Sequence, residues 1–336
     1  WIVRSKDGAG FIFLNSYQDH VEMQDISGVH FELRTPNETL SIPAENSLTL
    51  QKNVSAILPF GLSLEGIRLK YATTQLFARI EQDYFFFALP GMISEYCFDG
   101  HLVIPVTPGT GDVITLQNAD GQVVRIFTLT REQAEHAAKV MLQGKERLVI
   151  AEGTLVPVGD GVSLYSTSTK ISLSIFPALE GALSTDSGTF SEAADGLFTR
   201  YDLVIPEKTV ALALEPISPG KMAITLPADI LDGVDNVYLS VDYLGDIGNC
   251  FIDGKLVADN FYNGTAWEIG LKQILRGKRG SEVELLILIT PIRTNTGTAS
   301  YVPTGMAFNI DQDAAGVAEI RSITPVVDYK IPLKLL

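Results

Sequence analysis

The sequence predicts an all-β protein made of consecutive β-sandwich domains with one short helix. Short runs rich in Val, Ile, Phe, Tyr and Thr recur along the 336 residues and are separated by Gly, Pro, Asn and Asp. Hydrophobic residues make up 46% of the chain and charged residues 19%, which provides enough apolar material for packed cores and excludes a disordered chain. The length corresponds to two or three domains.

The first part of the chain alternates between strand-like runs and turn residues. Residues 75–80 and 84–89 flank three polar residues, a pattern typical of a β-hairpin with a short loop. Residues 119–121 (Ala-Asp-Gly) predict a further turn. The other strands expected in this part are 10–17, 29–33, 39–42, 47–50, 55–59, 66–71, 102–106, 113–117 and 123–128.

One segment has a helical pattern. Thr130 and Gln133 match the capping box, in which the Thr hydroxyl accepts from the N3 amide and the Gln side chain reaches back to the first amide. Apolar residues then follow at helical spacing, and Gly144 is suited to end a helix. The sequence therefore predicts a helix over about 131–143. A shorter helix is expected from about 265 to 275.

Strands dominate again after Gly144. The stretch 181–196 is poor in hydrophobic residues and rich in Ser, Thr, Asp and Gly, which predicts a linker or long loop with a domain boundary near it. The spacing of the later strands suits a β-sandwich of the jelly-roll type. The strands expected here are 147–151, 155–158, 163–166, 170–176, 210–214, 223–226, 237–243, 250–252, 283–290 and 318–325.

Charge and residue inventory argue against several functions. The 40 acidic residues outnumber the 25 basic ones, which disfavours nucleic acid and anionic membrane surfaces as partners. No apolar run approaches the ~20 residues of a membrane-spanning helix. Cys97 and Cys250 are too few for a disulfide framework or a zinc site, so buried thiols are expected, with a single bridge as the alternative. No metal or cofactor is predicted, because the histidines lack ligand spacing and no nucleotide-binding loop occurs. Calcium near Asp242, Asp246 and Asp259 stays open as an alternative, because it prefers oxygen ligands, although these residues lack the spacing of a calcium loop.

The many carboxylates raise the question of a glycosidase-type pair. Glu95 stands beside Tyr96, and Glu268 stands beside Trp267. Glutamate is common in an acidic β protein, however, and such neighbours arise readily by chance. No catalytic residue is therefore predicted.

Segment 259–268 is the best candidate for a binding site. It places aromatic, amide and carboxylate side chains within ten residues, after a tight turn at 252–255. Proteins bind sugars with such sets, because aromatic rings cover C–H faces while polar groups bond the hydroxyls. The structural alternative is that the aromatics close one end of the sandwich. The candidate carbohydrate-binding residues are Asp259, Asn260, Tyr262, Asn263, Trp267 and Glu268.

An ordered set of segments carries a resemblance to a known family. Its first members are residues 8–17 (GAGFIFLNSY), 40–43 (LSIP), 57–60 (ILPF), 69–75 (LKYATTQ) and 84–91 (YFFFALPG). They look like the domain that follows the catalytic barrel in glycoside hydrolase family 35, the β-galactosidases. Residues 129–134 (LTREQA) and 146–148 (ERL) resemble the middle region of that family. Its C-terminal galactose-binding-like jelly roll is similar to residues 242–246 (DYLGD), 252–254 (IDG) and 259–271 (DNFYNGTAWEIGL).

The resemblance implies a region without the catalytic machinery. Members of the family carry two catalytic glutamates in a (β/α)8 barrel, which needs ~250 residues and eight helices. This chain is already assigned to strands, so no barrel fits and no glutamate is carried over. The expected units are 1–92, resembling the post-barrel domain; 93–198, a middle β domain with the helix; and 199–336, the jelly roll.

We therefore expect a non-catalytic accessory region that supports a catalytic (β/α)8 barrel, upstream or in trans, and binds galactose-containing carbohydrate. The chain starts at Trp1 with no signal segment, which favours a processed product or a fragment. The compartment is left open, with secretion or the periplasm favoured. Two alternatives remain, an independent carbohydrate-binding module and a protein-binding scaffold that uses an edge strand or an exposed aromatic patch.

Overall fold

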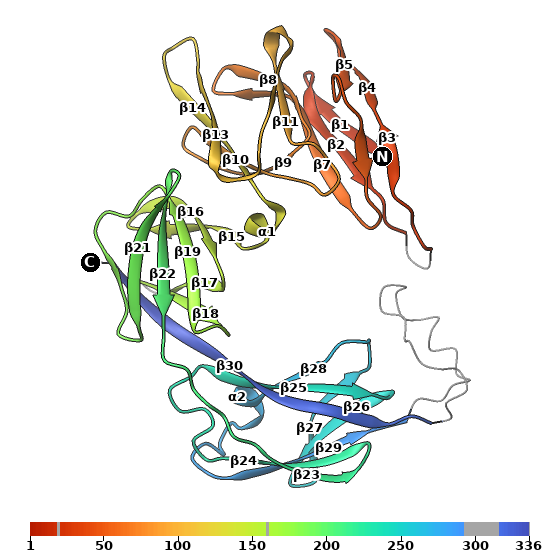
Figure 1. The fold of residues 1–336 in the computed structure, drawn as a ribbon, viewed down its shortest axis with the longest axis vertical. Coiled ribbons are helices and arrows are strands. Elements are labelled where there is room, and N and C mark those ends of the chain that lie inside the picture. The colour runs from red at the N-terminus through yellow and green to blue at the C-terminus, as the bar shows by residue number, and fades with distance from the viewer. Residues whose placement is uncertain (19–20, 159–160, 292–315, 336) are drawn as a thin grey trace.

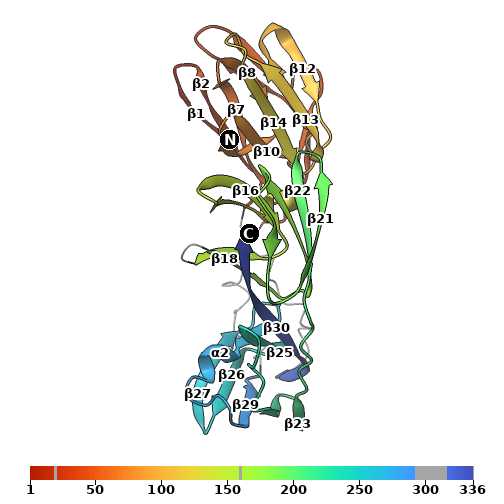
Figure 2. The ribbon, with the colours of Figure 1, turned by 90° about the vertical axis from the view of Figure 1, so that its left-hand side faces the viewer.

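The computed structural model describes residues 1–18, 21–158, 161–291 and 316–335, and its strands form three units stacked along the long axis of the molecule (Figures 1 and 2). Nearly all regular structure is β, in several sheets, so the predicted all-β sandwich class is confirmed. No helix in the described part of the chain is both long and apolar enough to span a membrane.

A six-stranded sheet forms the centre of the first unit and is covered on both faces. Tyr96 and Cys97 are adjacent in one strand yet enter different cores, because side chains alternate across a sheet. Small two-stranded sheets cover one face and a four-stranded sheet covers the other. The central order is β1 (Ile2–Lys6), β2 (Ala9–Asn15), β7 (Ser55–Leu64), β8 (Ile67–Ala72), β11 (Glu95–Phe98) and β12 (Leu102–Pro105), with η1 (Asp99–His101) before β12. The covering sheets are β3 (Ile26–Val29) with β6 (Leu48–Leu50), β4 (Phe31–Arg34) with β5 (Thr39–Ile42), and β13 (Gly109–Gln117), β14 (Val123–Leu129), β10 (Asp83–Phe87) and β9 (Gln75–Ile80).

The middle unit is a sandwich whose core takes buried residues from two facing sheets, among them Val149, Leu164 and Leu203. One sheet has the order β15 (Ala137–Leu142), β16 (Lys145–Ala151), β19 (Lys170–Phe176), β22 (Phe198–Val204) and β21 (Thr189–Asp195). The facing sheet contains β17 (Thr154–Val158) and β18 (Gly161–Ser166), and the short β20 (Leu183–Ser184) pairs at its margin.

The third unit is a second sandwich around its own core. One sheet has the order β23 (Ala213–Ser218), β24 (Lys221–Leu226), β29 (Val283–Ile289), β26 (Ile247–Ile252) and β27 (Lys255–Phe261). The other contains β25 (Asn236–Leu244) and β28 (Trp267–Gly270), and α2 (Leu271–Ile274) follows β28 directly. The jelly-roll topology stays a prediction.

One long strand, β30 (Glu319–Leu335), is shared by the middle and third units (blue in Figure 1). Its first half pairs with β25 and its second half with β18, so a single sheet of order β17–β18–β30–β25–β28 runs through both units. Ile323 is buried in the core of the third unit, whereas Tyr329 and Ile331 are buried in that of the middle unit. The two units are therefore joined by backbone hydrogen bonds as well as by a linker.

The first and middle units meet through a cluster of aromatic rings. Phe85 and Phe127, from β10 and β14, stack with ring centroids 4.7 Å apart. Phe176 and Phe198, from β19 and β22, pack against both of them, at centroid distances between 5.1 and 6.3 Å. All four side chains are buried, so this contact is a core in its own right.

The helix predicted over 131–143 is mostly wrong. The capping box at Thr130 and Gln133 is present, but α1 (Arg131–Glu135) ends after five residues and is followed by β15. Gln143 and Gly144 both have positive φ and form the turn of the β15–β16 hairpin, which matches the type I′ preference. Pairing with β16 and burial of Val140 and Leu142 outweigh a helical pattern that rested largely on alanines.

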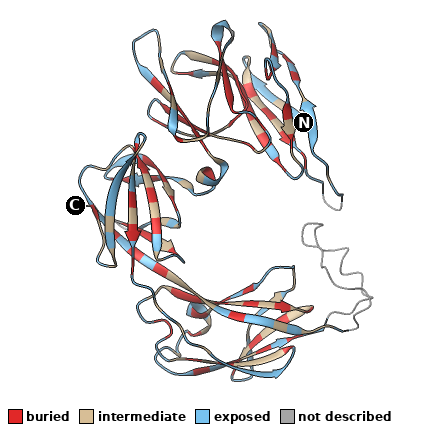
Figure 3. Ribbon diagram, in the orientation of Figure 1, coloured by how far each residue is buried: buried red, intermediate tan, exposed pale blue. Residues whose placement is uncertain are grey.

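The helix predicted over 265–275 is present only as α2, because β28 occupies the residues before it. The linker predicted over 181–196 is also wrong, since β20 and β21 lie within it and β21 pairs with β22 along its whole length. Most residues of β21 are exposed, as expected for an edge strand, which explains the low hydrophobicity (Figure 3).

Strand pairing crosses the positions expected to separate the units. β11 pairs with β8 across position 92, and β30 pairs with β18 across position 198. Two other expectations agree with the structure. β9 and β10 form the short hairpin, and Cys97 and Cys250 are buried free thiols.

Candidate functional site

Two adjoining hollows lie on the third unit and at its border with the middle unit. The first, here called the edge cavity, has a volume of about 840 Å³ and lies between β27, β28, α2 and the residues after α2. The second, the junction cavity, has a volume of about 550 Å³ and lies between the outer face of the shared sheet and residues of the middle unit. Tyr238 and Glu268 line both cavities. Both volumes fall within the ~300–1,000 Å³ that is usual for ligand sites.

Strand alternation directs Tyr238 of β25 outward. Its neighbours Val237, Leu239 and Val241 are fully buried, whereas Tyr238 is half-buried. The residue opposite Tyr238 on β28 is Gly270, and a Cβ added there would lie 3.5 Å from the tyrosine ring. The ring therefore lies over the backbone of β28, where it forms a wall common to both cavities.

The same alternation separates two of the predicted residues on β28. Glu268 is exposed, while Trp267 is only 6% exposed. The Trp267 ring packs at 6.3 Å from that of Tyr243, and a Cβ added to Gly248 would approach it to 2.9 Å. Trp267 borders the edge cavity, but its contacts lie mainly in the core. It fixes the position of β28, and thereby that of Glu268.

The start of α2 is tied to the start of β25. The Asn236 side-chain oxygen accepts from the backbone amides of Lys272 and Val237, at 2.8 and 2.9 Å. The Lys272 ammonium donates to both carboxylate oxygens of Asp235, at 2.7 and 2.8 Å. These contacts hold one wall of the edge cavity in place.

The edge cavity carries charges of both signs. The Asp235–Lys272 ion pair is half-exposed, with 47% of the lysine side chain and 17% of the aspartate side chain accessible. An open site of this kind, with donors and acceptors around a ring face, suits a hydroxyl-rich ligand. The remaining charged residues that line it are Asp259, Glu268, Arg276 and Arg279.

The junction cavity is more acidic, and Asp328 of β30 contributes to its floor. Burial raises the pKa of the Asp328 carboxyl above its ordinary value, and the nearby Asp235 carboxylate raises it further, while Lys272 opposes both effects. The middle unit contributes further polar lining residues, among them His136, Glu152, Tyr165 and Thr167.

The amide and tyrosine side chains of segment 259–268 stabilise its loop. Asn260 donates to the Tyr243 hydroxyl at 2.9 Å, and the Tyr262 ring packs at 5.2 Å from the Tyr243 ring. The Asn263 side-chain oxygen accepts from the Thr265 amide and hydroxyl, at 3.1 and 2.7 Å. None of the three predicted residues lines either cavity. The predicted residues that the edge cavity brings together are Asp259, Trp267 and Glu268.

Sequence reasoning missed Tyr238 and Asp328. A local signal for Tyr238 did exist, because it alternates with buried apolar residues in the predicted strand 237–243. No local signal marks Asp328, since its position depends on β30 pairing with two different units.

The second carboxylate considered for catalysis, Glu95, lies on β11 in the first unit. It is 3% exposed and accepts from the Tyr71 hydroxyl at 2.8 Å. Glu95 and Glu268 thus belong to different units and form no catalytic pair. Across the described ranges, no group of three or more His, Cys, Asp and Glu side chains is placed to hold a metal ion.

No protein-family model matches this chain, and no curated protein sequence matches it.

Proposed function

We propose that this chain is a non-catalytic accessory region of a β-galactosidase-like glycoside hydrolase, and that its third unit binds galactose-containing carbohydrate. The observation that carries the proposal is the edge cavity. There the half-buried Tyr238 ring stands beside Asp259 and Glu268 on rigid strands. The ordered resemblance to family 35 adds the substrate class.

The composition of the edge cavity favours a sugar over an apolar ligand. Six charged side chains line it beside apolar ones such as Val257 and Ile274, and a wholly apolar ligand would leave the hydrogen bonds of the charged groups unmade. A pyranose suits both the aromatic ring and the charged groups, because its C–H face covers the ring and its hydroxyls both donate and accept hydrogen bonds. In this proposal, turnover belongs to a (β/α)8 barrel upstream or in trans.

The scaffold alternative has a weaker structural basis. β23 is an exposed edge strand with two exposed apolar residues, Leu214 and Ile217, as strand addition requires. The same strand carries Glu215 and Pro216, and charges and proline are the usual means of preventing edge-to-edge pairing. Carbohydrate binding therefore remains the preferred proposal.

Isothermal titration of the whole chain with galactose and short galacto-oligosaccharides tests the proposal. We expect weak binding, and we expect Tyr238→Ala to reduce the affinity at least tenfold, because the ring face is lost. The matched control is Tyr17→Ala, which removes an exposed tyrosine of the first unit. Equal binding by both variants, or no binding by the unaltered chain at millimolar sugar, would overturn the proposal.

A chromogenic β-galactoside tests the non-catalytic part of the proposal. We expect no turnover by the chain alone. Hydrolysis that persists through purification and disappears in Glu268→Gln would place a catalytic group in this chain, contrary to the proposal.

A further inference from the structure

We propose that the ligand of this region is an extended chain of neutral sugars that lies across the border between the third and middle units, from the edge cavity through the junction cavity. This inference rests on the proposed function and adds to it the length and the charge of the ligand. It is carried by the continuity of the two cavities, by a second tyrosine and by the acidic lining of the junction cavity.

The two cavities share a wall. Tyr238 and Glu268 border both of them, so a ligand that leaves the edge cavity over the Tyr238 ring enters the junction cavity directly. Strand register explains this continuity. Tyr238 is opposite Val326 on β30, and Asn236 is opposite Asp328, which places Tyr238, Val326 and Asp328 on the same outer face.

A second tyrosine lies at the far side of the junction cavity. Tyr165 of β18 is opposite Lys330, four positions beyond Val326 along β30, and the Lys330 ammonium lies 5.8 Å from the ring centroid. β18 and β25 flank β30, so standard strand spacing and rise place the Cα atoms of Tyr165 and Tyr238 roughly 16 Å apart. A separation of this size favours a chain of several sugars over one hexose as the ligand that contacts both tyrosines.

The two tyrosines are held by one rigid element. Backbone hydrogen bonds join β18 and β25 to the same strand, β30, which runs without a break between the two cores. A ligand that spans them therefore does not have to order two separate domains, and little conformational entropy is lost on binding.

The charges of the junction cavity select against an anionic chain. Its carboxylates are Glu152, Glu268 and Asp328, and His136 is its one basic side chain among the described lining residues. Asp328 is partly desolvated and stands near Asp235 and the lysine paired with it, Lys272. Lys330 is a further cation beside Tyr165, so among the lining residues themselves acidic groups exceed basic ones. A uronate or a sulfated sugar would be repelled here, whereas a neutral hydroxyl can donate to these acceptors.

A ladder of β-1,4-linked galacto-oligosaccharides of one to six units, titrated calorimetrically into the whole chain, tests the inference. We expect the affinity to rise at least tenfold between the disaccharide and the pentasaccharide. Tyr165→Ala should abolish that increase and leave the affinity for the disaccharide within twofold of the unaltered chain. Acidic oligogalacturonides of the same length should bind at least tenfold more weakly than the neutral series.

Thr167→Trp supplies a second variant that removes no core contact. Thr167 is exposed and lines the junction cavity, so the added indole should obstruct long ligands only. Thermal unfolding of both variants checks that the fold is retained, and Tyr17→Ala is again the matched control.

The outcomes separate the two proposals. If the disaccharide binds as tightly as the pentasaccharide, or if both variants bind the pentasaccharide normally, the inference fails while the proposed function stands. If acidic and neutral chains bind equally, the assignment of charge is wrong. If no member of the ladder binds, the proposed function itself fails.

Discussion

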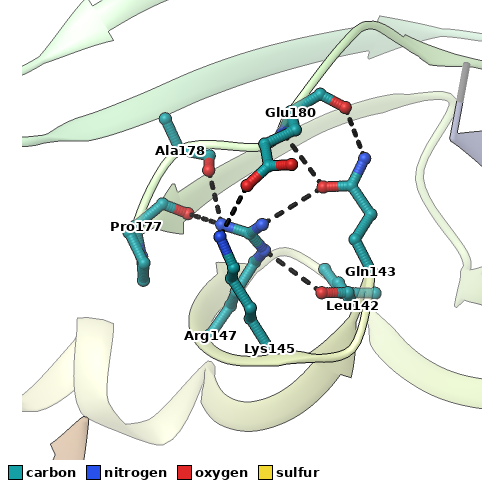
Figure 4. A network of polar contacts seen from close by, with 7 residues as sticks. All are labelled: Leu142, Gln143, Lys145, Arg147, Pro177, Ala178 and Glu180. Carbon is teal, nitrogen blue, oxygen red and sulfur yellow. Dashed lines mark hydrogen bonds and ion pairs between the residues drawn. The ribbon is translucent and has the colours of Figure 1, made fainter. Parts of the chain in front are cut away.

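Arg147 shows how a single buried cation can organise a loop. It is 1% exposed, and its guanidinium donates to backbone carbonyls of Leu142, Pro177 and Ala178 and to the side chain of Gln143 (Figure 4). The β15–β16 turn is thereby joined to the segment after β19. A buried charge with this many carbonyl partners is satisfied, and its loss would leave several acceptors unpaired.

Replacing Arg147 with methionine should lower the free energy of unfolding by about 3 kcal/mol, because the buried carbonyls lose their donors while the side-chain volume is largely kept. Urea unfolding measures the change. The control is Lys145→Met in the same network, whose exposed ion pair with Glu180 should contribute far less to stability, because water screens it. Equal effects of the two substitutions would contradict this account.

Glu38 lies in a partly buried ion-pair network in the first unit. Its two carboxylate oxygens lie 2.7 Å from the Lys70 ammonium and 2.7 Å from the Arg68 guanidinium, and the Lys70 side chain is 9% exposed. The hydrogen bond from Lys70 lowers the pKa of Glu38, although burial opposes it, and the charges of Lys70 and Arg68 lower it further. The carboxylate form is thus favoured in the folded state.

Glu38→Gln should therefore destabilise the protein by roughly 1.5–3 kcal/mol at pH 7. Because the folded pKa lies below the unfolded value of about 4.3, the stabilisation is complete above that pH and is lost as the pH falls through the folded pKa. The difference between variant and unaltered protein should shrink accordingly between pH 5 and pH 2 in urea unfolding. Glu135→Gln, at an exposed helical ion pair, should change stability by at most about 0.5 kcal/mol at either pH.

At the scale of elements, the local sequence pattern and long-range strand pairing favour different structures for the same residues. The capping box at Thr130 determines where α1 begins, because its two hydrogen bonds lie within four residues. It does not determine how far the helix extends. Residues 137–142 instead pair with β16, where they bury Val140 and Leu142, and a five-residue helix results.

Edge strands escape prediction for a related reason. β21 has a polar sequence because neither of its faces is fully covered, so its composition resembles that of a loop. Its pairing with β22 supplies the backbone hydrogen bonds that hydrophobic burial does not. Asp195 at its end accepts from Thr110 and Ser174, at 2.6 and 3.0 Å, which also attaches this edge to the first unit.

At the scale of the whole molecule, two different kinds of contact join the three units. β30 connects the middle and third units through a continuous sheet, whereas the rings of Phe85, Phe127, Phe176 and Phe198 connect the first and middle units through side-chain packing. The junction cavity depends on the continuous sheet, because its walls come from both sides of β30.

The cluster of aromatic rings between the first and middle units should be sensitive to truncation. Phe127→Ala removes a fully buried ring that contacts three others, and we expect a loss of about 3–5 kcal/mol, seen by calorimetry as a lower melting temperature. Phe261→Ala is the matched control, since Phe261 is 72% exposed. An unchanged melting temperature in Phe127→Ala would show that the cluster of aromatic rings adds nothing to stability.

The amino-acid sequence alone determined the all-β class, most strand positions, the 75–89 hairpin and the buried thiols. These features follow from alternation and turn chemistry, which act over a few residues. The alternation in the sequence also indicates that Tyr238 points outward, although Tyr238 was not among the predicted binding residues.

Only the tertiary structure decided which residues meet across the units. β30 pairs with strands about eighty and more than a hundred and sixty positions earlier in the chain, and no local pattern encodes such partners. That pairing brings Asp328 together with Tyr238 and Tyr165 in the lining of the junction cavity. The physical reason is that side-chain direction is set by the neighbouring residues, whereas strand pairing is set by which apolar faces the whole chain can bury together.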